Sequence, residues 1–203
     1  MAFNFSIAQL QPNVRDEILA GKGFWYNTAV TGTNALAAAG TGSAPMLYNS
    51  KTSPVNVRII AIKYGMISGT DIEAYIYYGI AVNPVVTLAS TTYVQPVNCI
   101  GTGGNASQIQ QGTDGGWAPI TVAIATAPTM WALSGVSLPG ATAAGGIIGP
   151  TIDILDGTII VKPGVAFFPY LCNGAGALVA SVSILAIEDP IPYGNITGIG
   201  QGG

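Results

Sequence analysis

The chain has 203 residues, of which 49% are hydrophobic and only 7% charged, and its formal net charge is −3. Its length allows one domain with a sizeable core, and its six basic residues form no cluster, which argues against direct nucleic-acid binding. Gly, Pro, Thr, Asn or Ser interrupts every long apolar run, so no membrane-spanning helix is expected. Soluble domains average about 25% charged residues, so this composition predicts a protein that buries much of its surface against partners.

Residues 6–22 form the one segment with a helical pattern. Pro12 suits the first turn, and acidic residues lie early, where the helix dipole favours them. Val14, Ile18 and Leu19 fall on one apolar stripe, and two glycines end the segment. We therefore expect a short helix that packs on the rest of the domain or reaches a neighbouring subunit.

A long β-hairpin is the main feature expected in the first half of the chain. Residues 24–30 predict a first strand, 31–44 a loop or arm, and 45–49 a short strand. Residues 55–82 then alternate with period 2 on both sides of a break at residues 68–71. Both parities carry apolar residues, which predicts strands covered on both faces. The hairpin therefore indicates a two-sheet fold in which the outer surface of a sheet is also covered by another element or molecule.

The middle of the chain is less regular. Residues 91–99 predict a strand, which Pro96 places at a sheet edge or a bulge. Residues 101–116 are the most polar stretch and predict a long loop or two short edge strands, and loops of this length tend to serve an interaction. Residues 120–125 and 129–133 are expected to form a hairpin-like pair.

The last third of the chain returns to strands. Asp156-Gly157 is a strong turn signal, so residues 151–155 and 158–162 predict a hairpin around it. The C-terminal tail has no core periodicity and is expected to be an extended arm that orders against a neighbour. Two further strands are predicted at residues 165–172 and 178–187, and the tail covers residues 189–203.

These elements predict an all-β fold. Roughly nine or ten strands, separated by turn signals and preceded by one short helix, are typical of a β-sandwich or jelly roll. We expect a single domain spanning residues 1–203, because no internal repeat or linker divides the chain. Within it, residues 1–23 would form the N-terminal helix and arm, 24–188 the sandwich, and 189–203 the extended tail.

The residue types leave little room for catalysis. The chain contains no histidine, which removes Ser-His-Asp triads, Cys-His pairs and histidine-ligated metals. Cys99 and Cys172 lack a CxxC partner, and the first residues do not resemble a secretory signal, so reduced and buried thiols are favoured over a disulfide. We expect no cofactor and no metal.

Paired carboxylates can hydrolyse glycosides. No apolar cleft signature accompanies those in this chain, so turn chemistry and solubility are the favoured interpretations. Asn105 and Asp114 offer oxygen atoms for Ca²⁺, but the spaced acids of a calcium-binding loop are missing. The carboxylate pairs are Asp71 with Glu73, Asp153 with Asp156, and Glu188 with Asp189.

Aromatic residues offer a second chemical interpretation, because tryptophan and tyrosine rings can stack on sugars. No ring of polar partners accompanies them, and aromatic side chains in strands more often belong to a core or a subunit interface. The interface or core is therefore favoured over a glycan site. The residues concerned are Trp25, Tyr26, Tyr75, Tyr77, Tyr78, Trp117 and Trp131.

Two parts of the chain resemble a known group. Residues 46–49, 55–62 and 67–70 (MLYN, VNVRIIAI and ISGT) resemble the opening half of small virion structural proteins of tailed bacteriophages. Residues 159–164 (IIVKPG) and 177–190, which end in Glu-Asp-Pro, resemble the closing half. The resemblance covers about half the chain. It implies a capsid decoration or cement protein of jelly-roll type, located in the virion as a homo-oligomer, commonly a trimer, and it supplies no catalytic residues.

We therefore expect a non-enzymatic protein of the capsid surface, made in the bacterial cytoplasm, that binds the major capsid protein and stabilises the shell as a homotrimer without contacting nucleic acid or membrane. Two alternatives stay open: a fibre or spike module that binds a receptor or glycan, and a subunit that forms the capsid lattice itself. An enzyme ranks last. Interface residues are expected at Val14, Ile18, Leu19, Trp25, Gln108, Gln110, Trp117, Pro190, Ile191, Tyr193, Ile196 and Ile199.

Overall fold

A computed structural model describes residues 12–27, 33–34, 44–49, 51–69, 74–82, 96–101, 116–120, 129–134, 151–173 and 178–191. Within these ranges lie a short helix, a π-helical turn and eleven strands. The elements are α1 Pro12–Glu17, η2 Ile18–Lys22, β1 Gly23–Asn27, β2 Thr33–Asn34, β3 Ala44–Asn49, β4 Val55–Gly69, β5 Ala74–Val82, β6 Val97–Asn98, β7 Gly116–Ile120, β8 Thr129–Ser134, β9 Thr151–Val161, β10 Val165–Asn173 and β11 Leu178–Pro190.

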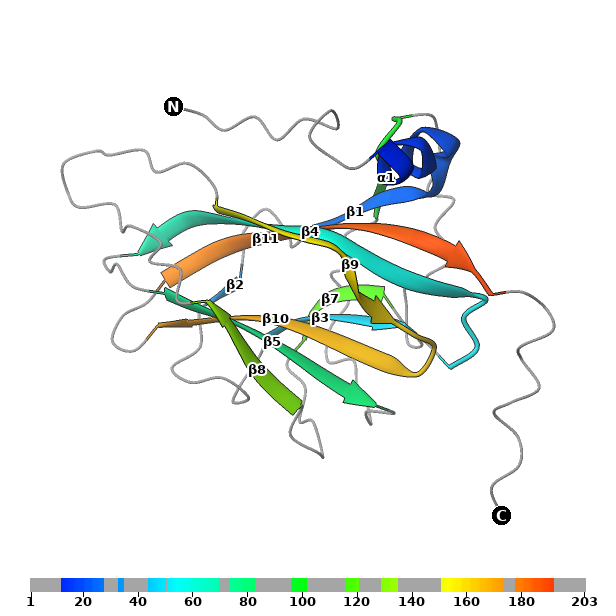
Figure 1. The fold of residues 1–203 in the computed structure, drawn as a ribbon. Helices are drawn as coiled ribbons and strands as arrows, with labels where there is room; N and C mark the ends of the chain where they lie inside the picture. Colours follow the sequence, from blue (N-terminus) through cyan, green and yellow to red (C-terminus); the bar gives the residue numbers. More distant parts are fainter. Residues whose placement is uncertain are drawn as a thin grey trace, which may run out of the picture.

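The strands form two antiparallel sheets. Sheet A has the order β6-β1-β11-β4-β9, with β2 also paired to β11, and sheet B has the order β7-β3-β10-β5-β8. In Figure 1 the two sheets lie one above the other, and α1 lies on the outer side of sheet A, away from sheet B. The all-β class with one short helix is therefore confirmed for the described part of the chain.

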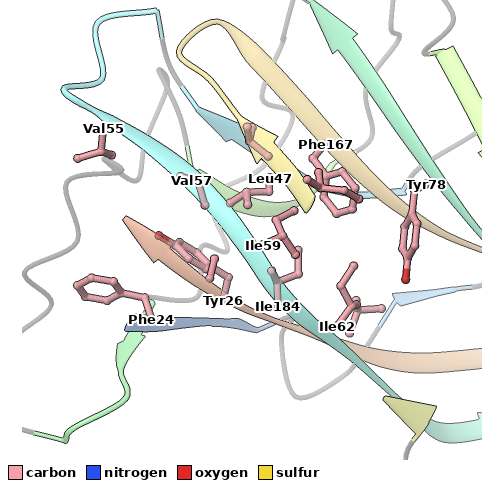
Figure 2. Close-up of a cluster of buried hydrophobic side chains, with 14 of the residues drawn as sticks. Phe24, Tyr26, Leu47, Val55, Val57, Ile59, Ile62, Tyr78, Phe167 and Ile184 are labelled. Carbon is pink, nitrogen blue, oxygen red and sulfur yellow. The ribbon is translucent and has the colours of Figure 1, made fainter. Parts of the chain in front are cut away.

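The main apolar core lies between the two sheets. Val57 and Ile59 of β4 face Leu47 of β3 and Phe167 of β10, as Figure 2 shows. The rings of Tyr78 and Phe167 add an aromatic contact with a centroid separation of 5.6 Å. Each large side chain that is fully buried in this way stabilises the fold by about 1.5–3 kcal/mol, so this layer is the main source of stability in the described structure.

A bulge at Ile60 explains why the apolar residues of β4 follow no single parity. Ile59 and Ala61 pair with consecutive residues of β11, so Ile60 is an extra residue in the strand. Ile59 and Ile62 consequently face the core between the sheets, whereas Ile60 and Ala61 both face the outer side of sheet A. The strand is apolar on both faces, as expected, but the outer face at this point is covered by the helix of the same chain.

The hairpin predicted across residues 55–82 is wrong. β4 lies in sheet A between β11 and β9, whereas β5 lies in sheet B between β10 and β8. The chain therefore crosses from one sheet to the other between these strands, through residues 70–73, which lie outside the described ranges. Period-2 alternation determines which side chains share a face of a strand, but it does not determine which strand lies alongside.

The hairpin predicted around Asp156-Gly157 is also wrong, because β9 is one continuous strand. Both halves of β9 pair with β4, and residues 155–158 bulge out opposite Ile60. The local turn chemistry is present, since Asp156 and Gly157 have φ values of 51° and 77° and Thr158 Oγ1 donates a hydrogen bond to the Leu155 carbonyl oxygen at 2.8 Å. After this excursion the chain continues along β4 instead of reversing.

Of the pair predicted at residues 120–125 and 129–133, residues 129–133 lie in β8, whereas residues 121–125 lie outside the described ranges. β7 and β8 lie at opposite edges of sheet B. Pro96 directly precedes β6, which is the outermost strand of sheet A among those that the structure describes, and residues 91–95 of the predicted strand lie outside the described ranges. Residues 6–11 of the predicted helix, residues 102–115 of the predicted loop and residues 192–203 of the tail lie outside the described ranges, and β11 extends to Pro190, beyond the predicted end of the sandwich.

One buried polar residue joins three strands at a corner of the fold. The Asn49 side chain, at the end of β3, donates from Nδ2 to the carbonyl oxygens of Val55 at 2.8 Å and Val161 at 2.9 Å. The Asn49 carbonyl oxygen accepts a hydrogen bond from the backbone nitrogen of Gly164 at 2.7 Å. Gly164 has a φ of 81°, which suits a turn after Pro163. This amide therefore connects the two sheets where β9 turns into β10.

Candidate interaction surface

The outer face of sheet A carries a second, smaller apolar cluster beneath α1 and η2. We call these two elements, residues 12–22, the helical segment. An isolated helix of this length is not stable in water, so packing on the sheet holds it in place. Its Val14 and Ile18 meet Ile60 and Ala61 of β4 and Leu185 and Ile187 of β11.

The apolar stripe predicted on this segment is only partly correct. Val14 and Ile18 are 2% and 0% exposed, whereas Leu19 is 56% exposed. Successive side chains on a helix point about 100° apart, so Leu19 cannot share the buried side of Ile18. Val14 and Ile18 therefore serve packing within the chain and leave no surface for a partner, in contrast to the interface role expected for them. The Leu19 side chain is exposed and remains available for contact with a partner.

Two glycines end the helical segment at the edge of sheet A. Gly21 has a φ of 82°, which favours glycine, and a Cβ atom at Gly23 would lie 2.7 Å from Cγ1 of Ile18. Asn98 Nδ2 donates to the Gly21 carbonyl oxygen at 2.9 Å, and the Cys99 backbone nitrogen donates to the Gly23 carbonyl oxygen at 3.0 Å. These contacts fasten the end of the segment to β6.

Arg58 of β4 joins the helical segment to the end of β11 through two ion pairs. Its guanidinium donates from Nε to Asp189 Oδ2 at 2.9 Å and from Nη2 to Asp189 Oδ1 at 3.3 Å and Glu17 Oε2 at 2.5 Å. The Arg58 side chain is 19% exposed and the two carboxylate side chains 31% and 34%. The hydrogen bond to Asp189, opposed in part by desolvation, raises the pKa of Arg58.

The bulge in β9 makes room for the Arg58 side chain. A Cβ atom at Gly157 would lie 2.8 Å from both Cγ and Cδ of Arg58. Gly157 also has a positive φ, so both the space and the backbone conformation favour glycine. The glycine of the Asp156-Gly157 turn therefore leaves space for the Arg58 side chain on the neighbouring strand. Arg58 in turn holds Glu17 of the helical segment and Asp189 at the end of β11.

Exposed apolar residues gather at two edges of sheet A. Leu19, Val97 and Ile100 are 56%, 52% and 38% exposed and belong to η2, β6 and the turn that follows β6. Ile154 and Ile160 are 52% and 47% exposed on β9, which forms the opposite edge of the described sheet. Exposed apolar groups of this kind favour contact with another molecule when they cluster.

Two buried tyrosines place hydrogen bonds within the core. Tyr26 donates to Glu188 Oε1 at 2.5 Å within sheet A. Tyr78 of sheet B donates to Asp153 Oδ2 of sheet A at 2.6 Å, which links the two layers. Burial, together with the Asp153 carboxylate, raises the pKa of Tyr78. These carboxylates are therefore structural acceptors.

Tyr64 is a third buried tyrosine, close to the hydrogen bond between Tyr78 and Asp153. Its side chain is fully buried, and in the described part of the chain its hydroxyl has no hydrogen-bond partner. Burial, with a smaller effect from Tyr78, raises its pKa well above the ordinary value. A buried hydroxyl without a partner costs about 1–3 kcal/mol, so the Tyr64 hydroxyl contributes less to stability than that of Tyr78, which donates to Asp153.

Cys99 is a free thiol that packs against the outer cluster. Burial raises its pKa to about 11. The thiolate is the reactive form of cysteine, so Cys99 is poorly reactive at neutral pH and acts as a small apolar residue, as the sequence indicated.

The remaining predicted interface residues are spread over the fold. Trp25 is half-buried against the outer cluster. Pro190 is exposed, and Ile191 is half-buried and donates its backbone N–H to the Pro54 carbonyl oxygen at 2.9 Å. Trp117 lies in β7, but its side chain is not among those described. Gln108, Gln110, Tyr193, Ile196 and Ile199 lie outside the described residues.

The carboxylates of Glu188 and Asp189 do not face one another, and the predicted pair Asp71 and Glu73 lies outside the described residues. Glu188 and Asp189 are adjacent on a strand and point to opposite faces, one to Tyr26 in the core and the other to Arg58 outside. Within the described ranges, no group of three or more Cys, Asp or Glu residues is arranged to hold a metal ion. No helix in those ranges is long and apolar enough to cross a membrane.

Comparison of the chain with protein-family models, with curated proteins and with solved structures gives no match.

Sequence reasoning missed the structural roles of Arg58 and Asn49. One signal was available for Arg58, because a charge within an apolar strand requires a partner when it is shielded from water. Nothing in the sequence identified Glu17 and Asp189 as its partners.

Proposed function

We propose that this protein is a non-enzymatic structural subunit of a bacteriophage virion, a decoration or cement protein that binds the major capsid protein as a homotrimer on the capsid surface. The proposal includes a jelly-roll fold. It combines the charge-poor composition and the arrangement of the strands with the resemblance in residues 46–49, 55–62, 67–70, 159–164 and 177–190.

The nested pairing of eight strands carries the proposal. In chain order these strands are β1, β3, β4, β5, β8, β9, β10 and β11. The first pairs with the last, the second with the seventh, the third with the sixth and the fourth with the fifth. A long hairpin folded over on itself gives this pairing, which is typical of a jelly roll. Viral capsid domains and lectins use that architecture.

The function would be adhesive. Glu17, Glu188 and Asp189 are engaged within the chain, which supports a structural role for these acids. A subunit with few charges loses little by desolvation when it packs against copies of itself or a shell. Each contact can be weak, because many symmetric copies act together.

A glycan-binding fibre or spike module is the second candidate, because lectins share the architecture. Sugar sites need exposed aromatic rings. Among the aromatic side chains that the structure describes, none is exposed, and Trp25 is the only one that is half-buried. This observation favours the capsid-binding role over glycan recognition.

Co-sedimentation with capsids tests the proposal. Purified subunit is mixed with particles assembled from the major capsid protein of the same genome, and bound copies per particle are counted at increasing subunit concentration. We expect saturation at a fixed number of copies, and light scattering on a sizing column should give a trimer for the free subunit. Particles that already carry the subunit are the control and should take up none.

Three results would contradict the proposal. Failure to bind the particles would exclude the decoration role. Shells or sheets formed by the purified chain alone would indicate a lattice-forming subunit. Binding on a glycan array without binding to capsids would favour the fibre or spike module.

A further inference from the structure

The exposed charges of the described structure are mostly cations, although the whole chain has a formal net charge of −3. Four of the described carboxylates are bound by donors of the same chain. By contrast, every basic residue except Arg58 is exposed and forms no ion pair with a described residue. The described surface is therefore richer in unpaired cations than the net charge indicates. These cations are Arg15, Lys22, Lys51, Lys63 and Lys162.

Two of these lysines lie at the same end of the two sheets. Lys51 belongs to the turn between β3 and β4, and Lys162 belongs to the turn between β9 and β10. Figure 1 shows both turns at the right-hand end of the sheets, together with the end of β11. We call residues 51–54, 162–164 and 190–191 the lysine end.

Hydrogen bonds hold the segments of the lysine end together. The Asn49 side chain donates to the Val161 carbonyl oxygen at 2.9 Å, and the Asn49 carbonyl oxygen accepts from the backbone nitrogen of Gly164 at 2.7 Å. The backbone nitrogen of Ile191 donates to the Pro54 carbonyl oxygen at 2.9 Å, which fastens the end of β11 to the first turn. The backbone that carries the two lysines is thus already ordered, and an ordered site loses little entropy on binding.

No acidic residue opposes the two lysines within the lysine end. Its sequence contains no Asp or Glu, and its exposed Thr52, Pro54 and Pro190 are uncharged. Asp189, which directly precedes Pro190, is bound to Arg58. The end is therefore positively charged as a whole, and a partner that presents carboxylates is complementary to it.

We propose that the lysine end is the surface through which the subunit meets the major capsid protein, and that Lys51 and Lys162 bind an acidic segment of that protein. This inference rests on the proposed function and adds to it the docking surface and the chemistry of the partner. The predicted interface residues Pro190 and Ile191 belong to the same end. Exposed ion pairs are weak individually, and repetition over many copies on the capsid strengthens them by multivalency.

Carbodiimide cross-linking tests the chemistry of the partner. The reagent joins a lysine amine to a carboxylate in contact with it, and the water that is removed converts the carbodiimide to a urea. Wild-type subunit bound to capsids is treated, and the cross-linked peptides are identified by mass spectrometry. We expect Lys51 and Lys162 to be joined to Asp or Glu residues of the capsid protein. Lys22 and Lys63, which are also exposed, are internal controls and should give no such peptides.

Charge reversal tests the contribution of the two lysines to binding. Lys51→Glu with Lys162→Glu should weaken capsid co-sedimentation about tenfold at about 0.1 M salt, and less at about 1 M salt, where charges are screened over about 3 Å. Lys22→Glu with Lys63→Glu makes the same change in net charge elsewhere and should weaken binding less than about twofold. Lys51→Arg with Lys162→Arg keeps both charges and should bind like the wild type. Unchanged melting temperatures verify that the variants fold.

Three outcomes would contradict one of the two proposals. Cross-links from Lys22 or Lys63 alone, or equal weakening by the two charge-reversed variants, would overturn the lysine end as the docking surface while wild-type capsid binding persists. A smaller oligomer of Lys51→Glu with Lys162→Glu in light scattering would show that the lysine end binds a second copy, which also overturns it. Failure of the wild type to bind capsids would contradict the proposed function itself.

Discussion

Sheet A is apolar on both faces, but the two faces are covered in different ways. The inner face meets sheet B along the length of its central strands. The outer face is covered by Val14 and Ile18 of the helical segment, which Arg58 and a few hydrogen bonds fasten at its ends. Coverage of the inner face therefore belongs to the cooperative fold, while coverage of the outer face depends on a local element that can open by itself.

Alanine at two adjacent isoleucines should give the largest difference between the faces. Ile59 and Ile60 are both fully buried, one inside and one outside. We expect Ile59→Ala to cost about 4 kcal/mol and Ile60→Ala about 2 kcal/mol of unfolding free energy, because the helical segment can shift to fill the outer cavity. Denaturant titration measures both values. Equal losses would show that the two faces are equally rigid.

Two phenylalanine substitutions examine the polar part of the inner face. Tyr78→Phe removes the hydrogen bond to Asp153 and should cost about 1.5 kcal/mol, whereas Tyr64→Phe removes a buried hydroxyl without a described partner and should leave stability unchanged or raise it by up to about 1 kcal/mol. Thermal and chemical unfolding of both variants check this. A loss at Tyr64 as large as that at Tyr78 would mean that the Tyr64 hydroxyl is satisfied in solution.

Arg58→Met should loosen the outer cover without opening the core. The methionine keeps most of the apolar stem, so the expected loss is that of the partly screened ion pairs, about 1 kcal/mol. Hydrogen exchange should speed up in residues 12–22 more than in β4 and β11. Lys63→Met, on the exposed side of the same strand, is the matched control and should change neither quantity. Uniform acceleration of exchange in both regions would contradict a local cover.

The smallest expected effect concerns Cys99, whose thiol packs against the apolar cluster on the outer face of sheet A. Its pKa is raised from 9.0 to about 11, so its contribution to stability is complete below pH 9 and is lost as the pH rises toward 11. We expect the wild type to lose slightly more thermal stability than Cys99→Ala over that interval, as calorimetry can measure. Iodoacetamide should label Cys99 slowly at pH 8, and faster in Arg58→Met. Fast labelling of the wild type would show that the thiol is already accessible.

The sequence predicted local features well because they depend on neighbouring residues. The sequence pattern identified β4, β5, β10 and β11 as strands, and the Asp156-Gly157 signal did mark a departure from extended backbone. The sequence did not predict which strands pair with one another. The two hairpins were assigned because their arms are adjacent in sequence, whereas β4 is paired with β11 and β9. The bulge at Ile60 also reversed the parity on which the faces were assigned.

The candidate surface was predicted only in part for the same reason. Leu19 was expected at an interface and is exposed, but Val14 and Ile18, assigned with it, are buried within the chain. A stripe of three residues on a short helix does not reveal where the buried side ends. The ion pairs of Arg58 could not be found from spacing, because no local pattern connects β4 with residues near both ends of the chain.

The sequence by itself determined the strand-forming segments, the turn residues and the low content of charged residues, because backbone sterics and composition act locally. Only the tertiary structure decided which strands are neighbours, which side of the helical segment is exposed and where the buried acids find donors. Those features join residues far apart in the chain, such as Tyr26 with Glu188, 162 positions away, and Arg58 with Asp189, 131 positions away. Such contacts form only when packing of the whole domain outweighs the entropy of closing the loops between them.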